Sequence, residues 1–282
     1  MFNLDPTADG RLEVHNTEKR LRESVAAIER ILSTKSLGKR DALVLRGRLA
    51  FCDAFIFGRL GKISLQAITQ HAYAKPFNTS VDDILSGALQ VLRDRMVVAR
   101  PRQIDLNLIH TFVLFTDAAF DPVKGAGLGA VLVGPNRTVV AWFGLKLAMT
   151  HLQPILREGR QTVIGELETL AAAVALRLWS RILTSSKLLL FIDNEGARFS
   201  LIKGVSKAPA ITSICGIASQ VLDEFCIMPW FSRVPSPSNL ADLPSRDVSH
   251  PLLLLGLRTP HESVMCVVEE SLKSVGETCR PH

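Results

Sequence analysis

TFVLFTDAAF, residues 111–120, and KLLLFID, residues 187–193, decide the fold predicted for this chain. Both runs consist mainly of β-branched, leucine and aromatic residues, which is typical of strands buried inside a sheet. Asp117 lies in the middle of the first run, and Asp193 ends the second. A carboxylate in such a strand carries a desolvation cost unless a cation or hydrogen bonds compensate it. Since ligands usually bind at the ends of neighbouring parallel strands in an α/β sheet, the two aspartates predict a site there.

The segments around these runs predict a mixed α/β domain. GLGAVLVG (127–134) and TVVAWFGL (138–145) follow the first run after short turns, and three such strands predict an antiparallel meander. An Ala- and Leu-rich stretch over residues 164–183 predicts a long helix. The segments that follow predict two helices, at 195–203 and 211–225, and then a strand at 228–235. A last short helix, capped by Asn239, is predicted after that strand. The predicted order β-β-β-α-β-α-α-β-α corresponds to a mixed sheet flanked by helices.

The first part of the chain has a helical pattern instead. Residues 17–32 repeat apolar side chains at helical spacing, and either Asn16 or Thr17 is suited to cap that helix. Further helices are predicted over 40–60 and 81–98, the second stopped by Pro101, and a hairpin is predicted around Asp9-Gly10. The predicted organisation is a small, mainly helical domain over 1–105, an α/β domain over 106–250, and a C-terminal tail over 251–282 with no assigned role.

Composition and charge narrow the class of protein. Of the 282 residues 47% are hydrophobic, which excludes a disordered chain, and the longest apolar stretches are too short to span a bilayer. The first residues do not form a signal peptide, and five cysteines without a C-x-x-C pair predict reduced thiols rather than a zinc site. We therefore expect an intracellular protein, cytoplasmic or nuclear, without a membrane partner.

Residues 1–105 hold 17 Lys and Arg against 12 Asp and Glu, a basic arm compatible with a phosphate-backbone partner.

Two more acids belong to the predicted site. Glu168 lies near the start of the long helix, on the Ala-rich side that must pack on the sheet, and Asp242 follows the last strand. Carboxylates gathered from separate elements need a counter-charge, which Mg²⁺ or Mn²⁺ supplies because hard cations prefer oxygen ligands. Two such ions roughly 3.5–4 Å apart can activate water and stabilise a leaving oxygen in phosphodiester cleavage.

Each acid also has a structural interpretation. Asp117 can be satisfied by backbone donors near a turn, and Asp193 can cap the helix that follows it. Glu168 can be a solvated helical acid, and Asp242 a first-turn acid favoured by the helix dipole. All four structural interpretations must hold together to remove the predicted site.

Four segments resemble, in order, the acidic motifs of the ribonuclease H domain attached to retroelement reverse transcriptases. They are FTDAAF, ELETLAAAVAL, LLLFIDNEGA and SNLADLPSR, all within residues 110–247. The residues of these motifs are most similar to those of the DIRS-like retrotransposon branch, in which E-x-x-A, I-D-N-E and R-V-P-S…N-x-A-D-x-P-S-R recur. The last motif is present here from Arg233 to Ser236 and from Asn239 to Arg246.

The resemblance implies a ribonuclease H-like mixed sheet and a role for each acid. Asp117 would bridge two metal ions, Glu168 would bind one and help to orient the water, and Asp193 and Asp242 would complete the ligand sets. Glu166 is a rival for the helix position, although the spacing from Glu168 to Ala171 fits the family helix better. The sequence departs from many such enzymes in having no His between His151 and His250, where they place one before the last acid.

The first hundred residues resemble, less specifically, the thumb or connection region that follows the polymerase palm in the same elements. That region grips a duplex, and the residues that match it here include four cations that would contact phosphates, or else be solvated helix charges: Arg46, Arg48, Arg59 and Lys62. Arg233 is a fifth candidate for a phosphate contact. No polymerase aspartate pair is present, so an upstream polymerase portion of the same element is an implied partner.

The sequence therefore predicts a metal-dependent endonuclease that hydrolyses the RNA strand of RNA–DNA hybrids. An exonuclease or strand-transfer domain of the same superfamily is disfavoured by the A-D-x-P-S-R ending. The non-enzymatic alternative is a decayed fragment that only binds nucleic acid or serves as a connection-type scaffold.

Overall fold

The computed structural model describes residues 2–3, 11–98, 100–105, 111–156, 163–248 and 251–278. It divides into two compact units, Met1–Leu108 and Ile109–His282, each with its own hydrophobic core. Within the described residues no helix is both long and apolar enough to cross a bilayer.

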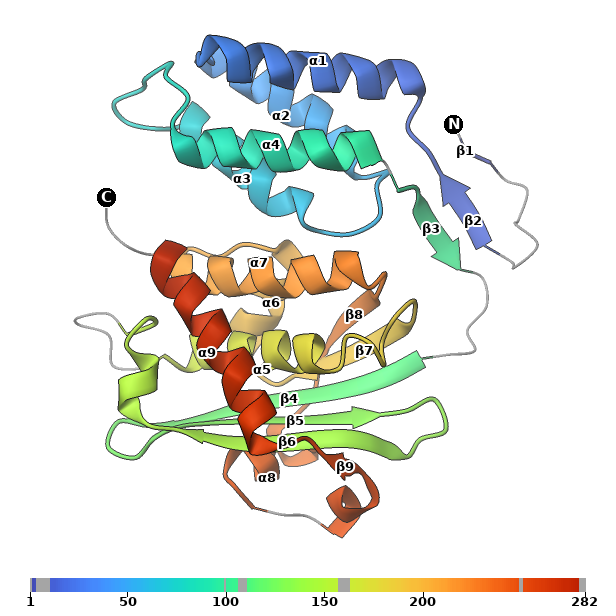
Figure 1. Ribbon diagram of the computed structural model, residues 1–282, viewed down its shortest axis with the longest axis vertical. Coiled ribbons are helices and arrows are strands. Elements are labelled where there is room, and N and C mark those ends of the chain that lie inside the picture. The colour runs from blue at the N-terminus through green and yellow to red at the C-terminus, as the bar shows by residue number, and fades with distance from the viewer. Residues whose placement is uncertain are drawn as a thin grey trace. The chain divides into compact units, whose positions relative to one another are not determined.

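The first unit is a bundle of four helices beside a small sheet (Figure 1). Thr17 caps α1, because its side chain accepts a hydrogen bond from the Arg20 backbone N–H. The predicted turn at Asp9-Gly10 lies outside the described residues, but the strands on either side of it pair antiparallel, Phe2 with Val14. The helices are α1 (Glu18–Thr34), α2 (Lys39–Asp53), α3 (Gly61–Ala72) and α4 (Asp83–Val98), and the strands are β1 (Phe2–Asn3), β2 (Arg11–Val14) and β3 (Arg102–Asp105).

The prediction of one helix over residues 40–60 is wrong at its end, and α3 was not predicted. After α2 the backbone of Phe55 and Phe57 bonds to that of Arg102 and Arg100, which draws the chain out of the helix. Gly58 then adopts a positive φ of 98°, a conformation that favours glycine. The break was not evident from the apolar spacing, since its cause is a long-range backbone pairing.

The second unit has a six-stranded sheet in the order β8-β7-β4-β5-β6-β9. The predicted meander and the parallel pairing of the two apolar runs are both confirmed, as is the mixed sheet with flanking helices. In Figure 1 helices α5, α6, α7 and α9 cover one face of this sheet and the short α8 lies on the other. The strands are β4 (Thr111–Asp121), β5 (Gly125–Val133), β6 (Val139–Leu147), β7 (Lys187–Ile192), β8 (Met228–Arg233) and β9 (Leu257–Arg258). The α-helices are α5 (Ile164–Leu178), α6 (Glu195–Lys203), α7 (Pro209–Glu224), α8 (Asp242–Ser245) and α9 (His261–Thr278), with 3₁₀ turns η1 (Met149–Leu152), η2 (Ser236–Ser238) and η3 (Pro251–Leu255).

The described part of residues 251–282, to which the sequence assigned no role, completes this unit. Strand β9 pairs in parallel with β6. Helix α9 packs against α5 and α7 and contributes Val264, Val268, Leu272 and Val275 to the core. The core of the second unit therefore extends to the end of α9.

Glycines in β5 and β6 let α8 approach the sheet closely. A Cβ on Gly127 would overlap the Ser245 carbonyl oxygen, one on Gly129 the backbone of Ala241 and Ser245, and one on Gly144 the Pro244 carbonyl oxygen. The backbone of α8 therefore packs directly on the sheet, and this close packing sets the distance of Asp242 and Ser245 from β4.

We expect Gly127→Ala to lower the free energy of unfolding of the second unit by about 1–3 kcal/mol, because backbone must shift to admit the methyl group. Gly276→Ala in α9 is the matched control, since its Cβ would meet only the Pro154 side chain at an ordinary 3.5 Å. Chemical denaturation of both variants measures the difference. Equal stability of the two would show that α8 does not rest on the glycines.

Candidate metal centre

The site lies where β4 extends beyond the end of its neighbour β7. Strand β4 pairs in parallel with β7 only as far as Phe115 and Phe191, whereas it continues to pair with β5 up to Asp121. Asp193 directly follows the end of β7, so two residues beyond the last pair it is level with Asp117. The parallel register therefore brings the two aspartates predicted from the sequence to the same place.

Glu168 reaches this place from α5. Residues Glu166–Leu176 of that helix are all buried, because α5 packs between the sheet and helices α7 and α9. Past the end of β7, the Ala118 backbone N–H of β4 is available on this edge and donates to the Glu168 carboxylate. Asp117, Glu168 and Asp193 each offer a carboxylate oxygen, and these three atoms lie within 4.8 Å of one another. We call these three residues the carboxylate cluster.

The electrostatics of the carboxylate cluster call for a cation. Burial raises the pKa of Asp117 to about 6, and the charges of Asp193 and Asp242 add to the rise. Burial, together with the charges of Asp117 and Asp193, raises the pKa of Glu168 to about 10. The buried Glu168 Oε2 has no hydrogen-bond partner among the described residues. An orphaned oxygen among converging carboxylates fits a hard divalent ion, which prefers oxygen ligands.

Asp242 lies beside the carboxylate cluster but outside it. It is the first residue of α8, and its Oδ1 accepts hydrogen bonds from Arg246 Nε at 3.0 Å and from the terminal guanidinium nitrogen at 2.9 Å. Its charge is close enough to raise the pKa of Asp117. The sequence placed Asp242 near the other acids, and the pairing with Arg246 was not predicted.

Three polar residues of the β8–α8 segment hold the aspartates, and the sequence reasoning missed their roles. Ser245 Oγ donates to Asp117 Oδ2 at 2.5 Å, and Ser236 Oγ donates to Asp193 Oδ2 at 2.8 Å. Asn239 Nδ2 lies 3.4 Å from Asp117 Oδ1 and donates to the Thr116 carbonyl at 3.0 Å. The prediction that Asn239 caps the last helix is wrong in position, because the cap is Ala241. The Asn239 Oδ1 accepts from the Ala241 backbone N–H at 3.2 Å, while its Nδ2 turns to β4. All three residues belong to the quoted terminal motif, which was the available signal.

The remaining predicted residues lie elsewhere. Glu166 is buried in the first turn of α5 but is outside the carboxylate cluster. Arg233, at the end of β8, is 63% exposed and lies 3.6 Å from Glu195 Oε1. The other four predicted phosphate contacts belong to the first unit: Arg46, Arg48, Arg59 and Lys62.

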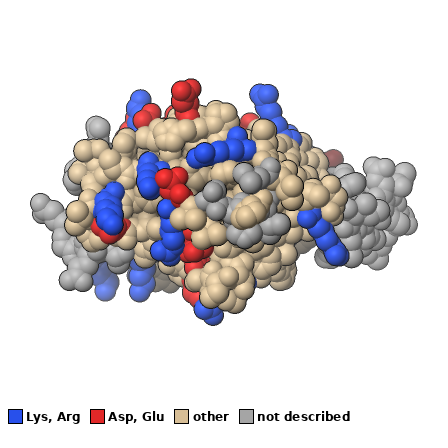
Figure 2. Space-filling view, turned by 90° about the horizontal axis from the view of Figure 1, so that it is seen from below, with Lys and Arg blue, Asp and Glu red and all other residues tan. Residues whose placement is uncertain are grey.

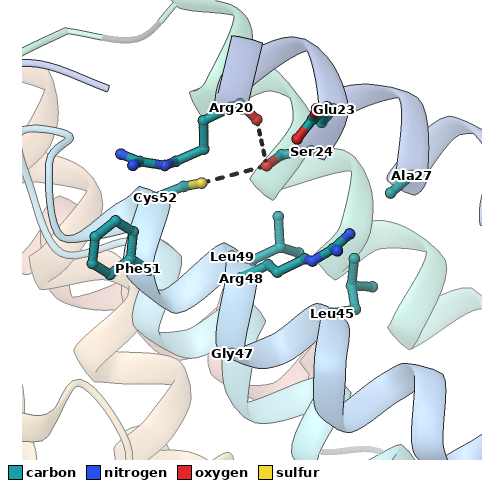
Figure 3. A pocket seen from close by; sticks show the side chains of 10 residues that line it. All are labelled: Arg20, Glu23, Ser24, Ala27, Leu45, Gly47, Arg48, Leu49, Phe51 and Cys52. Carbon is teal, nitrogen blue, oxygen red and sulfur yellow. Dashed lines mark hydrogen bonds between the residues drawn. The ribbon is translucent and has the colours of Figure 1, made fainter. Parts of the chain in front are cut away.

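On the first unit, Arg46 and Arg48 are exposed on α2, where the Arg46 Nε donates to Thr69 Oγ1 at 3.0 Å. Arg48 lines a pocket of about 370 Å³ between α1 and α2, together with Phe51 and with Arg20, whose guanidinium lies 4.7 Å from the Phe51 ring centre (Figure 3). Burial, with the nearby charge of Arg59, lowers the pKa of Lys62. Phosphate binding by these residues stays a prediction.

In chelator, the stability of the second unit should fall as pH rises. The pKa of Asp117 rises from 3.8 to about 6 on folding and that of Glu168 from 4.5 to about 10, so the folded chain binds more protons than the unfolded chain between these values. Unfolding then becomes more favourable as pH increases through that window. We expect the melting temperature to drop from about pH 5 to about pH 8, and Mn²⁺ to raise it more at the higher pH. A melting temperature that rises over this range, with no larger Mn²⁺ effect, would contradict the assignment.

Comparison with known proteins yields likeness in fold. No protein-family model and no curated protein matches the chain. Ribonuclease H1 from Halobacterium salinarum NRC-1 is 19% identical, with a TM-score of 0.40, covering 49% of this chain and 96% of that one. The N-terminal ribonuclease H domain of a Mycobacterium tuberculosis protein, solved as a fusion with maltose-binding protein, is also 19% identical, with a TM-score of 0.40 and coverages of 49% and 92%. A foamy viral protease-reverse transcriptase in complex with RNA/DNA hybrid is 14% identical, with a TM-score of 0.35 and coverages of 64% and 28%.

Proposed function

We propose that the second unit is a metal-dependent endonuclease that hydrolyses the RNA strand of RNA–DNA hybrids. The observation that carries the proposal is the convergence of Asp117, Glu168 and Asp193 from a strand, a helix and a strand end within 4.8 Å. Burial and the neighbouring charges raise the pKa of Asp117 and of Glu168, which supports a cation that compensates these carboxylates. A site of this kind needs no side-chain nucleophile.

Each residue of the site has a task in this proposal. Asp117, fixed by Ser245, belongs to the carboxylate cluster and would help to hold both ions, and Asp242 would be a fourth ligand from α8. Glu168 would lose its proton and hold a metal ion through Oε2, which has no hydrogen-bond partner among the described residues. Ser236 restrains the Asp193 carboxylate. When bound, Mg²⁺ or Mn²⁺ supplies Lewis-acid stabilisation of phosphate charge and a water of lowered pKa.

The substrate class comes from the sequence motifs. The resemblance to the ribonuclease H domain of DIRS-like retroelements supports a hybrid substrate, and hybrid selectivity would come from 2′-hydroxyl contacts in the minor groove. The same resemblance supports an upstream polymerase portion as a partner. It also supports phosphate contacts by the basic residues of the first unit.

A cleavage assay with three substrates tests this function. The purified chain is incubated with labelled RNA–DNA hybrid, duplex DNA and duplex RNA, in Mn²⁺ and in chelator. We expect cutting of the RNA strand of the hybrid only, and only with the metal. Equal cutting of all three duplexes, or cutting in chelator, would overturn the proposal. Binding of the hybrid without cutting would instead identify a decayed scaffold.

A further inference from the structure

Strands β4, β7 and β8 expose an apolar face on the side of the sheet opposite α5. Alternate residues such as Leu114, Leu190 and Phe231 are buried in the core with the helices. The residues between them point the other way and are half-buried or exposed. They form what we call the aromatic face: Val113, Phe115, Leu189, Phe191, Met228 and Trp230.

The aromatic rings on this face differ in exposure: Phe115 and Phe191 are half-buried, and Trp230 is exposed. The rings of Phe115 and Phe191 stack with centroids 5.1 Å apart and planes inclined by 15°. Trp230, in the next row of the sheet, is 73% exposed, whereas the chain's other two tryptophans, Trp142 and Trp179, are 7% and 3% exposed. A large exposed indole beside stacked rings is unusual for a surface that contacts only water.

The aromatic face continues directly into the carboxylate cluster. The register pairs Val113, Leu189 and Trp230 in one row, and Phe115 and Phe191 in the next. Asp117 and Asp193 follow as the third row, about 6.6 Å further along the strands. A groove of about 1020 Å³ borders both regions, since its lining includes Phe115 of the aromatic face together with Asn239 and Asp242, which lie beside the carboxylate cluster.

The charges near the aromatic face favour an anionic chain. Lys187 is two residues before Leu189 on the same side of β7, and Arg137 lines the groove. Figure 2 views the molecule from the side of α8 and shows a largely uncharged surface, with lysines and arginines at its margins and charges of both signs near its centre. Aromatic rings with Lys187 and Arg137 near them suit bases that stack and phosphates that pass beside them.

We propose that the aromatic face binds the bases of a single-stranded nucleic-acid segment that leads to or from the strand at the carboxylate cluster. This inference rests on the proposed function, because only a nuclease site at the carboxylate cluster would place the nucleic-acid strand there. Bases stack on Phe115, Phe191 and Trp230, and this lets the enzyme hold a single-stranded flank of its substrate. Because every base has a π-face, the binding is tolerant of sequence.

Trp230 provides a direct readout in chelator, where no cleavage occurs. A single strand of about 12 nucleotides should quench the fluorescence of Trp230, which is exposed. The other two tryptophans are buried, so their fluorescence should not change. An abasic strand of the same length should not quench it, because only the bases stack. Equal quenching by both strands, or by neither, would overturn the proposal.

Substitution at Trp230 tests the affinity. We expect Trp230→Ala to weaken binding of a labelled single strand by about 5- to 100-fold, and Trp230→Phe to restore most of it. Phe199→Ala is the matched control, because Phe199 is 47% exposed on α6, on the other side of the sheet, and should leave the affinity unchanged. Unchanged affinity in Trp230→Ala would refute the inference, and loss of a dimer in sedimentation without a change in affinity would assign the face to a second copy of the chain. Cleavage failing while single-strand binding persists would refute the proposed function alone.

Discussion

Asp117→Asn should lower Mn²⁺-dependent cleavage of an RNA–DNA hybrid by about 100-fold or more, while the chain stays folded. The amide keeps the shape of the side chain and can still accept the hydrogen bond from Ser245, but it removes the charge that faces both neighbouring carboxylates. In chelator the variant should be at least as stable as the parent, because a buried carboxylate beside Glu168 and Asp193 is gone. Single-turnover cleavage and thermal unfolding measure the two effects.

Asp121→Asn is the matched control for this substitution. Asp121 ends the same strand, and its Oδ1 accepts hydrogen bonds from the backbone N–H groups of Val123 and Lys124 in an exposed turn. An asparagine can accept the same bonds, so the control should cleave like the parent. If Asp117→Asn and Asp121→Asn were equally active, Asp117 would not belong to a catalytic metal site.

Glu168→Gln should have an effect as large as Asp117→Asn, whereas Glu166→Gln should change cleavage by less than about 10-fold. The two glutamates lie two residues apart in α5 and are both buried, so burial alone does not separate them. They differ in geometry, since only Glu168 places an oxygen within 4.8 Å of Asp117 and Asp193. Both variants remove one acid from α5, so a difference between them shows that the position of the acid in the helix matters for cleavage.

The outcome of this comparison is measured as cleavage rate against Mn²⁺ concentration. Glu168→Gln should need more metal and reach a lower rate at saturation. If the loss were found in Glu166→Gln instead, the helix would present the other glutamate to the metal. Equal and small losses in both would exclude α5 from the site.

The part of the fold that local pattern determines was predictable. Apolar runs rich in β-branched and aromatic residues gave the strands. One aspartate within such a run and one at the end of another indicated the site, because parallel strands in register bring equivalent positions together. Glu168 was predictable because an acid on the buried side of a helix requires compensation. These inferences use only neighbours in the sequence and one rule of sheet topology.

The parts that depend on long-range contacts were not predictable. The end of α2 is decided by backbone bonds to residues 100 and 102, and α9 joins the core through α5 and α7, far away in the chain. The hydrogen bonds from Ser245 to Asp117 and from Ser236 to Asp193 join residues that are 128 and 43 positions apart, and the first also depends on the packing of α8 on the glycines of β5. Asp242 was assigned from its position after the last strand and from its motif, and neither carried information about its ion pair with Arg246.

Calorimetric titration with Mn²⁺, in two buffers of different ionisation enthalpy at about pH 8, tests the central claim most directly. Because burial and neighbouring charges raise the pKa of Glu168 to about 10, the metal must displace a proton from that carboxyl as it binds. The prediction is saturable binding with release of about one proton per chain, which Glu168→Gln abolishes. Binding without proton release, or the same release from Glu168→Gln, would contradict a cation held by Asp117, Glu168 and Asp193.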